Sequence, residues 1–118
     1  MLSQESLELI ARACHEANRA ICEMEYDDMP SWDDAEPWQR EAAVNGVKYV
    51  LDNPTITPEQ MHDEWVKNKT DDGWVYGTIK DVEKRTHPSL VDYDELTEYG
   101  RLKDSIFNAI VKSFIKHK

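Results

Sequence analysis

The spacing of hydrophobic residues along the chain predicts four amphipathic helices. Apolar side chains recur at intervals of three and four residues in segments 3–23, 34–53, 57–72 and 101–116, as they do on the buried face of a helix. From residue 73 to residue 96 this period is lost, and Gly, Pro and β-favouring residues predict a short extended pair or an ordered loop. We therefore expect a mainly α-helical fold of four helices, with minor β structure around residues 73–96.

The same spacing predicts which side chains are buried. The first helix would bury Leu7, Ile10, Cys14, Ala17 and Ile21, and the third would bury Met61 and Trp65. The second helix would bury Trp38, Ala42, Ala43, Val47, Val50 and Leu51. The fourth would bury Leu102, Ile106, Ala109, Ile110, Ser113 and Phe114. On this interpretation Trp38 and Trp65 belong to the hydrophobic core.

Capping signals set the expected helix boundaries. Ser3 is the expected N-cap of the first helix, and Pro37 suits the first turn of the second. Thr57-Pro58-Glu59-Gln60 combines a capping box with a proline at the first helical position. Asn53-Pro54 would end the second helix, and Asp71-Asp72-Gly73 would end the third.

Length and composition are those of one globular domain. The chain has 118 residues, of which 40% are hydrophobic and 32% are charged, so we expect a single domain over residues 1–118 with its core within about 7–115. Cys14 and Cys22 would lie about 12 Å apart on one helix, which is too far for a disulfide. Because the start has no signal-peptide pattern and no apolar stretch approaches about 20 residues, we expect a cytoplasmic protein with no membrane partner.

The chain is strongly acidic, with a formal net charge of −10 from 24 acidic and 14 basic residues. A negative protein repels a phosphate backbone at long range, so nucleic acid is not an expected partner. The charge is unevenly spread: all charged residues in 25–36 are acidic, whereas the tail from Arg101 to Lys118 is mostly basic. Such stretches usually form solvated faces, although either could bind another protein.

No common catalytic or metal-binding signature is present. The chain lacks the GxxxxGK[ST] phosphate loop, the GxSxG elbow and the GxGxxG turn. His62-Asp63-Glu64 has the H-x-E form of the zinc deaminases, but their P-C-x-x-C partner is missing. The histidines do not have metal-ligand spacing. We expect no catalytic activity, no metal and no cofactor.

The most informative stretch follows the third predicted helix. It begins Gly73-Trp74-Val75-Tyr76-Gly77, and Lys80, Lys84, Arg85 and His87 follow within ten residues. On an extended segment Trp74 and Tyr76 would point to the same face. Flat rings beside cations suit a ligand that carries both an aromatic ring and an anionic group.

Together with the rest of the chain, this stretch resembles the ryanodine receptor repeat domain, the RyR domain. The resemblance covers roughly residues 7–115. The chain is similar in size to the standalone form of the domain found in bacteria and their phages. Its motifs are the helix residues 10–19, Pro37-Trp38-Gln39-Arg40-Glu41, His62 with Trp65, Gly73-Trp74-Val75-Tyr76-Gly77, Lys80-Asp81, Thr86-His87-Pro88 and Tyr93-Asp94-Glu95-Leu96. One position departs, because the family commonly has proline where Asp92 stands.

The resemblance implies a mainly helical fold, no known catalytic activity and a pocket for nucleotide-like ligands. Our leading hypothesis is a non-catalytic module that binds a nucleotide-derived or other anionic aromatic ligand. The candidate ligand-binding residues are Trp74, Tyr76 and Tyr93 for stacking, Lys80, Lys84 and Arg19 for phosphates, and His87 and His15 for further hydrogen bonds.

Two other functions stay open at this point. The chain could be a protein–protein interaction module or a homo-oligomer, in which the acidic stretch or the basic C-terminal helix docks a partner. A phage-encoded copy could instead sequester a nucleotide signal of its host. Titration with a panel of nucleotides separates the ligand-binding hypothesis from the interaction module.

Overall fold

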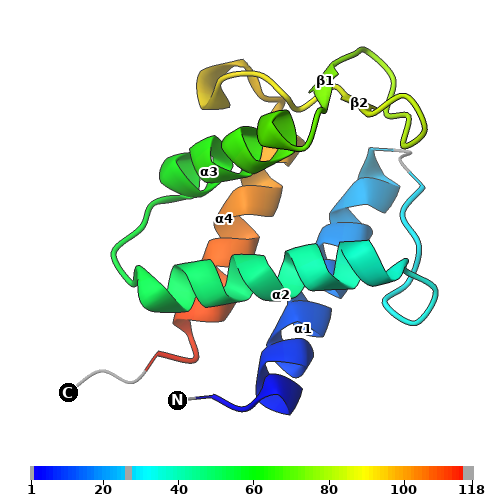
Figure 1. Cartoon of the computed structure of the whole chain (residues 1–118). Coiled ribbons are helices and arrows are strands. Elements are labelled where there is room, and N and C mark those ends of the chain that lie inside the picture. The colour runs from blue at the N-terminus through cyan, green and yellow to red at the C-terminus, as the bar shows by residue number, and fades with distance from the viewer. Residues whose placement is uncertain (1, 26–27, 116–118) are drawn as a thin grey trace.

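The computed structural model describes residues 2–25 and 28–115 and is mainly helical, as predicted. In chain order its elements are α1 (Gln4–Met24), α2 (Pro37–Asp52), α3 (Pro58–Asp71), β1 (Val75–Tyr76), β2 (Thr86–His87), the 3₁₀ helix η1 (Tyr93–Glu95) and α4 (Glu98–Lys112) (Figure 1). The two short strands pair in parallel, with Val75 opposite Thr86 and Tyr76 opposite His87. The predicted extended pair is therefore confirmed.

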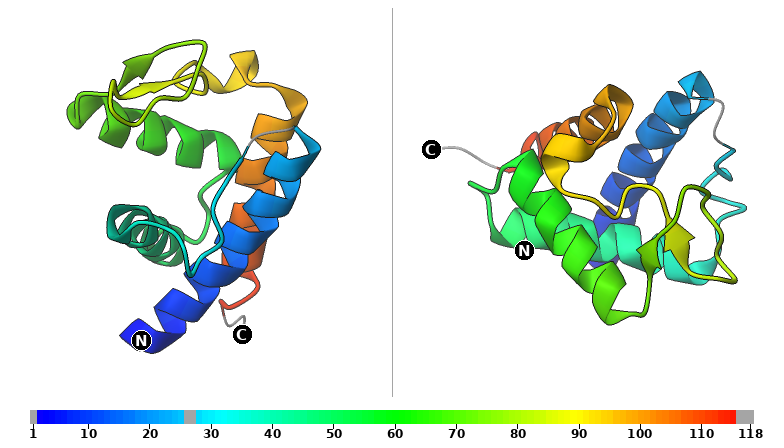
Figure 2. Two further views of the ribbon diagram at one scale, coloured as in Figure 1. Left: turned by 90° about the vertical axis from the view of Figure 1, so that its right-hand side faces the viewer. Right: turned by 90° about the horizontal axis from the view of Figure 1, so that it is seen from above.

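The helices form two layers. α1 and α4 lie side by side, α2 crosses them, and α3 packs against α4 beyond α2 (Figures 1 and 2). The segment with β1 and β2 lies over the end of α3, at the top of the molecule as drawn in Figure 1. This arrangement brings α1, α2, α3 and the β segment around one region, which the next section describes.

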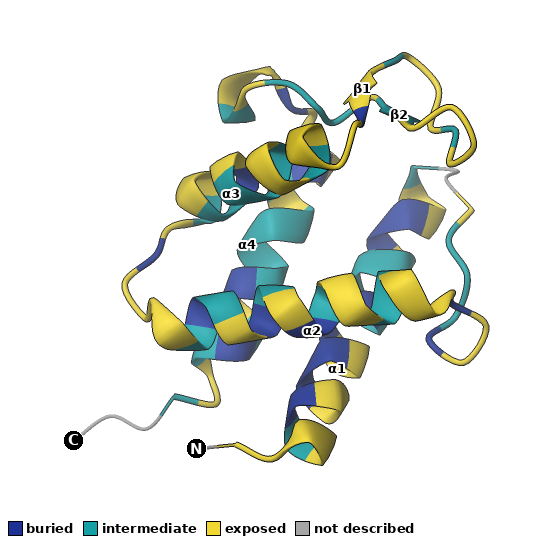
Figure 3. Cartoon of the chain, in the orientation of Figure 1, coloured by how far each residue is buried: buried dark blue, intermediate teal, exposed yellow. Residues whose placement is uncertain are grey.

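The core lies where α1, α2 and α4 meet (Figure 3). Its buried members are Leu7, Ile10, Ala11, Cys14, Trp32, Val44, Val47, Val50, Ile56 and Val111. The predicted stripe of α1 is confirmed except for Ala17, which is only half-buried. Both cysteines are buried and neither is in a disulfide, and burial raises the pKa of Cys14 to about 12.

Capping side chains begin three of the helices. The hydroxyls of Ser3, Thr57 and Thr97 each accept a hydrogen bond from the backbone N–H three residues on, and the predicted box of Thr57 with Gln60 is present. The cap at Thr97 corrects the fourth boundary, because α4 begins at Glu98 rather than near residue 101. α4 ends at Lys112, and the predicted end at residue 116 lies outside the described residues.

The predicted buried face of α4 is mostly wrong, although Ile106 and Ile110 are half-buried and Ile110 packs against the core. Leu102 and Phe114 are exposed, and so are Ala109 and Ser113, whereas Asn108 and Val111 are buried. α4 contacts α1, α2 and α3, so the buried side is set by where those helices lie rather than by the most hydrophobic stripe. The amide of Asn108 is accommodated there because Nδ2 donates to the Ile56 carbonyl at 3.1 Å.

The predicted face of α2 is partly wrong. Val47 and Val50 are buried as expected, and Val44, which the pattern missed, is buried as well. Ala42 and Trp38 are exposed instead, the latter by 40%. Trp38 stands in the first turn of α2, outside the cluster of core residues.

A buried histidine fastens the segment after β2 to the helices. His62 on α3 is almost completely buried and donates from Nε2 to the carbonyl of Val91 at 2.7 Å. Its Nδ1 lies 3.6 Å from Oδ2 of Asp104 on α4. Burial raises the pKa of Asp104 to about 6, although the charges of His62 and Lys103 act in the opposite direction.

No helix within the described residues has the length and apolar character that crossing a membrane would require.

The raised pKa of Asp104 predicts a pH-dependent effect of Asp104→Asn. Unfolded Asp104 loses its proton near pH 4, whereas the folded carboxyl keeps its proton to about pH 6, so its contribution to stability falls as pH rises between these values. The rise in pKa corresponds to at most about 3 kcal/mol. We expect the free energy of unfolding of Asp104→Asn, relative to the native chain, to increase by up to that amount from pH 4 to pH 7 in urea titrations. Asp63→Asn, which changes an exposed acid of α3, should show no such trend.

Candidate functional site

The site is built around the C-terminal end of α3. Gly73 has φ of 88°, a left-handed conformation that glycine adopts readily, and its N–H donates to the Thr70 carbonyl at 3.0 Å. The N–H of Trp74 donates to the Lys69 carbonyl at 2.9 Å. These two bonds form a Schellman motif, which brings the residue after the glycine back onto the last turn of the helix. The predicted turn at residues 71–73 is thus confirmed, and it places Trp74 beside Lys69.

Lys69 lies between two indole rings. Its Nζ is 4.7 Å from the ring centroid of Trp74 and 5.0 Å from that of Trp38, whose centroids are 6.5 Å apart. Burial lowers the pKa of this ammonium below its ordinary value, and nearby Lys80 lowers it further, while Asp72 acts in the opposite direction. Lys69 forms no ion pair with any residue that the structure describes. Among the described residues, this half-buried cation therefore has no bonded anion.

Two further aromatic rings lie near Lys69. Trp65 lies one turn before Lys69 on the same face of α3, and its ring meets that of His87 edge-on at 5.1 Å. His87 is in turn 6.4 Å from Trp74. The Nδ1 atom of His87 accepts from the N–H of Ser89 at 3.0 Å, so a neutral ring carries its proton on Nε2. We call Trp38, Trp65, Trp74 and His87 the ring cluster.

The ring cluster borders a cleft of about 180 Å³ between α1, α2, α3 and the β segment. The cleft is lined by His15, Asn18, Met29, Trp38, Gln39, Ala42, Ala43, Trp65, Lys69, Trp74, Lys80, His87 and Phe107. Within the described residues, Oδ1 of Asn18 is buried and has no hydrogen-bond partner. A buried polar atom without a partner is costly, so this amide is suited to hydrogen-bond a group that enters the cleft.

His15 has a structural contact besides its place in the cleft. Its Nε2 donates to the carbonyl of Pro30 at 2.7 Å, and its ring meets the edge of Trp32 at 5.6 Å. The neighbouring Glu16 accepts from the N–H of Trp32 at 2.9 Å, and this bond lowers the pKa of Glu16. α1 thereby holds Pro30 and Trp32, which precede α2, beside the cleft.

Four of the eight predicted ligand-binding residues line this cleft and four do not. Trp74, Lys80, His87 and His15 lie in it. The other four have different surroundings: Arg19 pairs with Glu16, Tyr93 packs beside His62, and Tyr76 and Lys84 are exposed.

The structure corrects the expected orientation of two aromatic residues. Trp74 and Tyr76 were expected on one face, but Trp74 is 5% exposed and Tyr76 is 56% exposed. β1 begins only at Val75, so the alternation of a strand does not extend back to Trp74, which follows the helix instead. The expectation that Trp38 and Trp65 are core residues is also wrong, since both line the cleft and neither is fully buried.

The pattern missed Lys69 as a member of the site. Its position could have been inferred from two local signals. Trp65 and Lys69 are four residues apart, and Asp71-Asp72-Gly73 predicts a helix end that returns the chain to Lys69. Trp38 carries no comparable signal, because its approach to Lys69 depends on how α2 crosses the fold.

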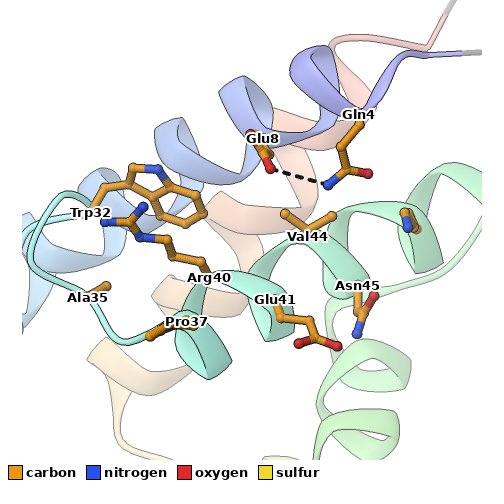
Figure 4. Close-up of a pocket in the computed structure, with 10 residues that line it drawn as sticks. Gln4, Glu8, Trp32, Ala35, Pro37, Arg40, Glu41, Val44 and Asn45 are labelled. Atoms are coloured by element: carbon orange, nitrogen blue, oxygen red, sulfur yellow. Dashed lines mark hydrogen bonds between the residues drawn. The ribbon is translucent and has the colours of Figure 1, made fainter.

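A larger hollow lies on the other side of α2 and has a different character. It measures about 510 Å³ and runs between the first turns of α1 and the part of α2 from Pro37 to Lys48 (Figure 4). Glu8 and Glu41 border it together with Arg40 and Lys48, and the guanidinium of Arg40 lies over the ring of Trp32 at 5.5 Å. The residues that line this hollow carry both signs of charge, and its one aromatic ring is already covered by Arg40. The hollow therefore fits an anionic aromatic ligand less well than the cleft does.

The described part of the chain contains no group of three or more His, Cys, Asp and Glu residues placed to hold a metal ion. The expected absence of a metal stays a prediction.

Truncating the two indoles that flank Lys69 should separate their structural roles. Trp74→Ala removes a buried ring and should lower the free energy of unfolding by about 3 kcal/mol or more. Trp38→Ala removes a ring that is 40% exposed and should cost less than about 1.5 kcal/mol. Urea denaturation followed by circular dichroism measures both. Equal losses would contradict the placement of Trp38 at the edge of the cleft.

The comparison with known families agrees with the resemblance noted in the sequence. The model of the RyR domain matches residues 44–117, which cover the last turns of α2, α3, the β segment and α4. The match includes Trp65, Lys69, Trp74 and His87, and it therefore contains most of the ring cluster. The chain belongs to the RyR domain family.

Proposed function

We propose that the protein is a non-catalytic module that binds a small ligand carrying an aromatic ring and an anionic group, in particular a nucleotide-derived ligand. The observation that carries this proposal is Lys69, a half-buried ammonium held against two indole rings with no ion pair to a described residue. Removing a lysine from water is costly unless an anion or hydrogen-bond acceptors offset the loss. An anionic ligand supplies that offset.

The neighbours of Lys69 support an anionic group at this position. Lys80 lines the same cleft and is close enough to lower the pKa of Lys69. A phosphate between the two ammonium groups would relieve their mutual repulsion and accept charge-assisted hydrogen bonds from both. The cleft is thus a local positive region in a protein whose net charge is −10.

The ring cluster and Asn18 support a nucleobase beside that phosphate. Stacking on aromatic side chains contributes about 1–3 kcal/mol per base. The side-chain amide of Asn18 can hydrogen-bond the polar edge of a base, whereas an apolar ring has no such edge. A volume of about 180 Å³ is below the usual range for drug-sized ligands, so we expect one ring to enter while the rest of the ligand stays in solvent.

We place this function in the cytoplasm. Cys14 and Cys22 are both buried thiols outside any disulfide, as is usual in a reducing compartment. Nucleotide-derived ligands are available there.

Titration calorimetry tests the proposal. The panel comprises mononucleotides, cyclic nucleotides, the matching nucleosides and inorganic phosphate. We expect micromolar dissociation constants for at least one nucleotide, which correspond to about −8 kcal/mol. The matching nucleoside should bind at least tenfold more weakly because it lacks the anionic group, and phosphate alone should not bind measurably. Absence of binding across the panel would refute the nucleotide assignment.

Lys69→Met should weaken nucleotide binding by about 10- to 100-fold, since a hydrogen bond to a charged group contributes about 1.5–3 kcal/mol. Nucleoside binding should change little, because methionine keeps the apolar stem against the indoles. Lys67→Met is the matched control: it removes an exposed lysine from the same helix, outside the cleft. If both variants lost affinity equally, a general charge effect would replace the assigned role of Lys69.

A further inference from the structure

One surface loop carries an unusual set of exposed apolar side chains. Within residues 75–85, which we call the apolar–basic loop, Val75, Tyr76, Ile79 and Val82 are all exposed, and Ile79 reaches 76%. Scattered exposed apolar residues are ordinary, but four within eight residues of one segment are a local concentration of the kind found at interaction sites. None of them lines the cleft.

The charges of two neighbouring loops are complementary. The apolar–basic loop exposes Lys80, Lys84 and Arg85, and the acidic loop, residues 28–36, exposes Asp28, Asp33, Asp34 and Glu36. Neither Lys80 nor Lys84 forms an ion pair with a described residue, and the same is true of those four acids. Lys80, Lys84 and the four acids are therefore available to a partner, whereas Arg85 is paired with Asp72.

The two loops lie on one side of the molecule. In Figure 1 both are on the right, and the view from above in Figure 2 also has both on the right. Met29 of the acidic loop and Lys80 of the apolar–basic loop line the same cleft. When two complementary surfaces lie on one face, that face can pair with the same face of a second copy across a two-fold axis. The basic surface of each copy then meets the acidic surface of the other.

We infer that this face is the interface of a symmetric homodimer, in which the apolar–basic loop of each copy docks on the acidic loop of the other. The apolar side chains around Ile79 supply the area that leaves water, and the lysines and acids set the orientation. The inference does not depend on nucleotide binding, and its tests use the protein without ligand.

Glu83 gives a test with a gain of function. It is the exposed acid within the apolar–basic loop, while the carboxylate of Asp81 is engaged by the N–H groups of Glu83 and Lys84. Facing the acidic loop of a second copy, Glu83 opposes association. Glu83→Lys should therefore tighten the dimer by about threefold or more, consistent with the modest strength of surface charge pairs.

Sedimentation equilibrium of the full chain over ~10 µM to ~1 mM measures the association. We expect the native chain to dimerise with concentration. The pair Lys80→Glu with Lys84→Glu should be monomeric, and so should the pair Asp33→Lys with Asp34→Lys. An equimolar mixture of these two proteins should form a dimer again, because each then presents the charges that the other lost.

Matched controls separate the face from general effects. Lys48→Glu with Lys67→Glu makes the same change of charge on exposed lysines elsewhere and should leave the dimer intact. Ile79→Ser should weaken dimerisation by about tenfold or more, whereas Leu9→Ser, at an exposed leucine of α1, should not. Circular dichroism checks that each variant is folded.

Three outcomes would overturn the inference. The first is a native chain that stays monomeric at ~1 mM. The second is a mixture of the two charge-reversed proteins that fails to associate. The third is a monomer that binds vesicles of anionic phospholipid or an acidic protein through Ile79, which would assign the face to that partner.

Discussion

The arrangement of the cleft depends on one local constraint, the way α3 ends. The Schellman motif at Gly73 returns the chain to the last turn of the helix and lays Trp74 over Lys69. From there the chain enters β1, whose pairing with β2 brings His87 against Trp65 and Trp74. A different helix end would move Trp74, the strand pair and His87 together. The cleft is thus specified by short-range backbone geometry more than by its own side chains.

The turn at Gly73 does not place every residue of the cleft. Packing between elements that are distant in the sequence places the others. His62, Asp104 and the carbonyl of Val91 connect α3, α4 and the segment after β2 in one buried contact. Trp38 reaches Lys69 only because α2 crosses the α1 and α4 layer at the required position. The ring cluster therefore combines residues fixed locally by α3 with residues placed by the tertiary fold.

This division explains what could be predicted from the sequence. The helix starts at Ser3 and Thr57 and the end near Gly73 were predictable, because a cap or a glycine acts on its immediate neighbours. The buried stripe of α4 was not predictable from hydrophobicity, since three helices surround it and a hydrogen-bonded Asn108 is preferred inside over Leu102. The same division explains why only half of the predicted ligand-binding residues line the cleft. Trp74 and His87 follow from the motif, whereas Tyr76 and Lys84 share its sequence but face solvent.

The crossover between β1 and β2 has a consequence for how this scaffold could diversify. Gly77 is needed where the chain leaves β1, because a Cβ there would lie 2.6 Å from Cβ of Thr86. Between that glycine and the bridge of Asp81 with Thr86, the backbone makes an excursion that carries Ile79 away from the helices. Residues inserted in that excursion would lengthen the protrusion while the strand pair stays closed. Evolution, or an engineer grafting a recognition peptide, could change what the loop contacts without rebuilding the rings beneath it.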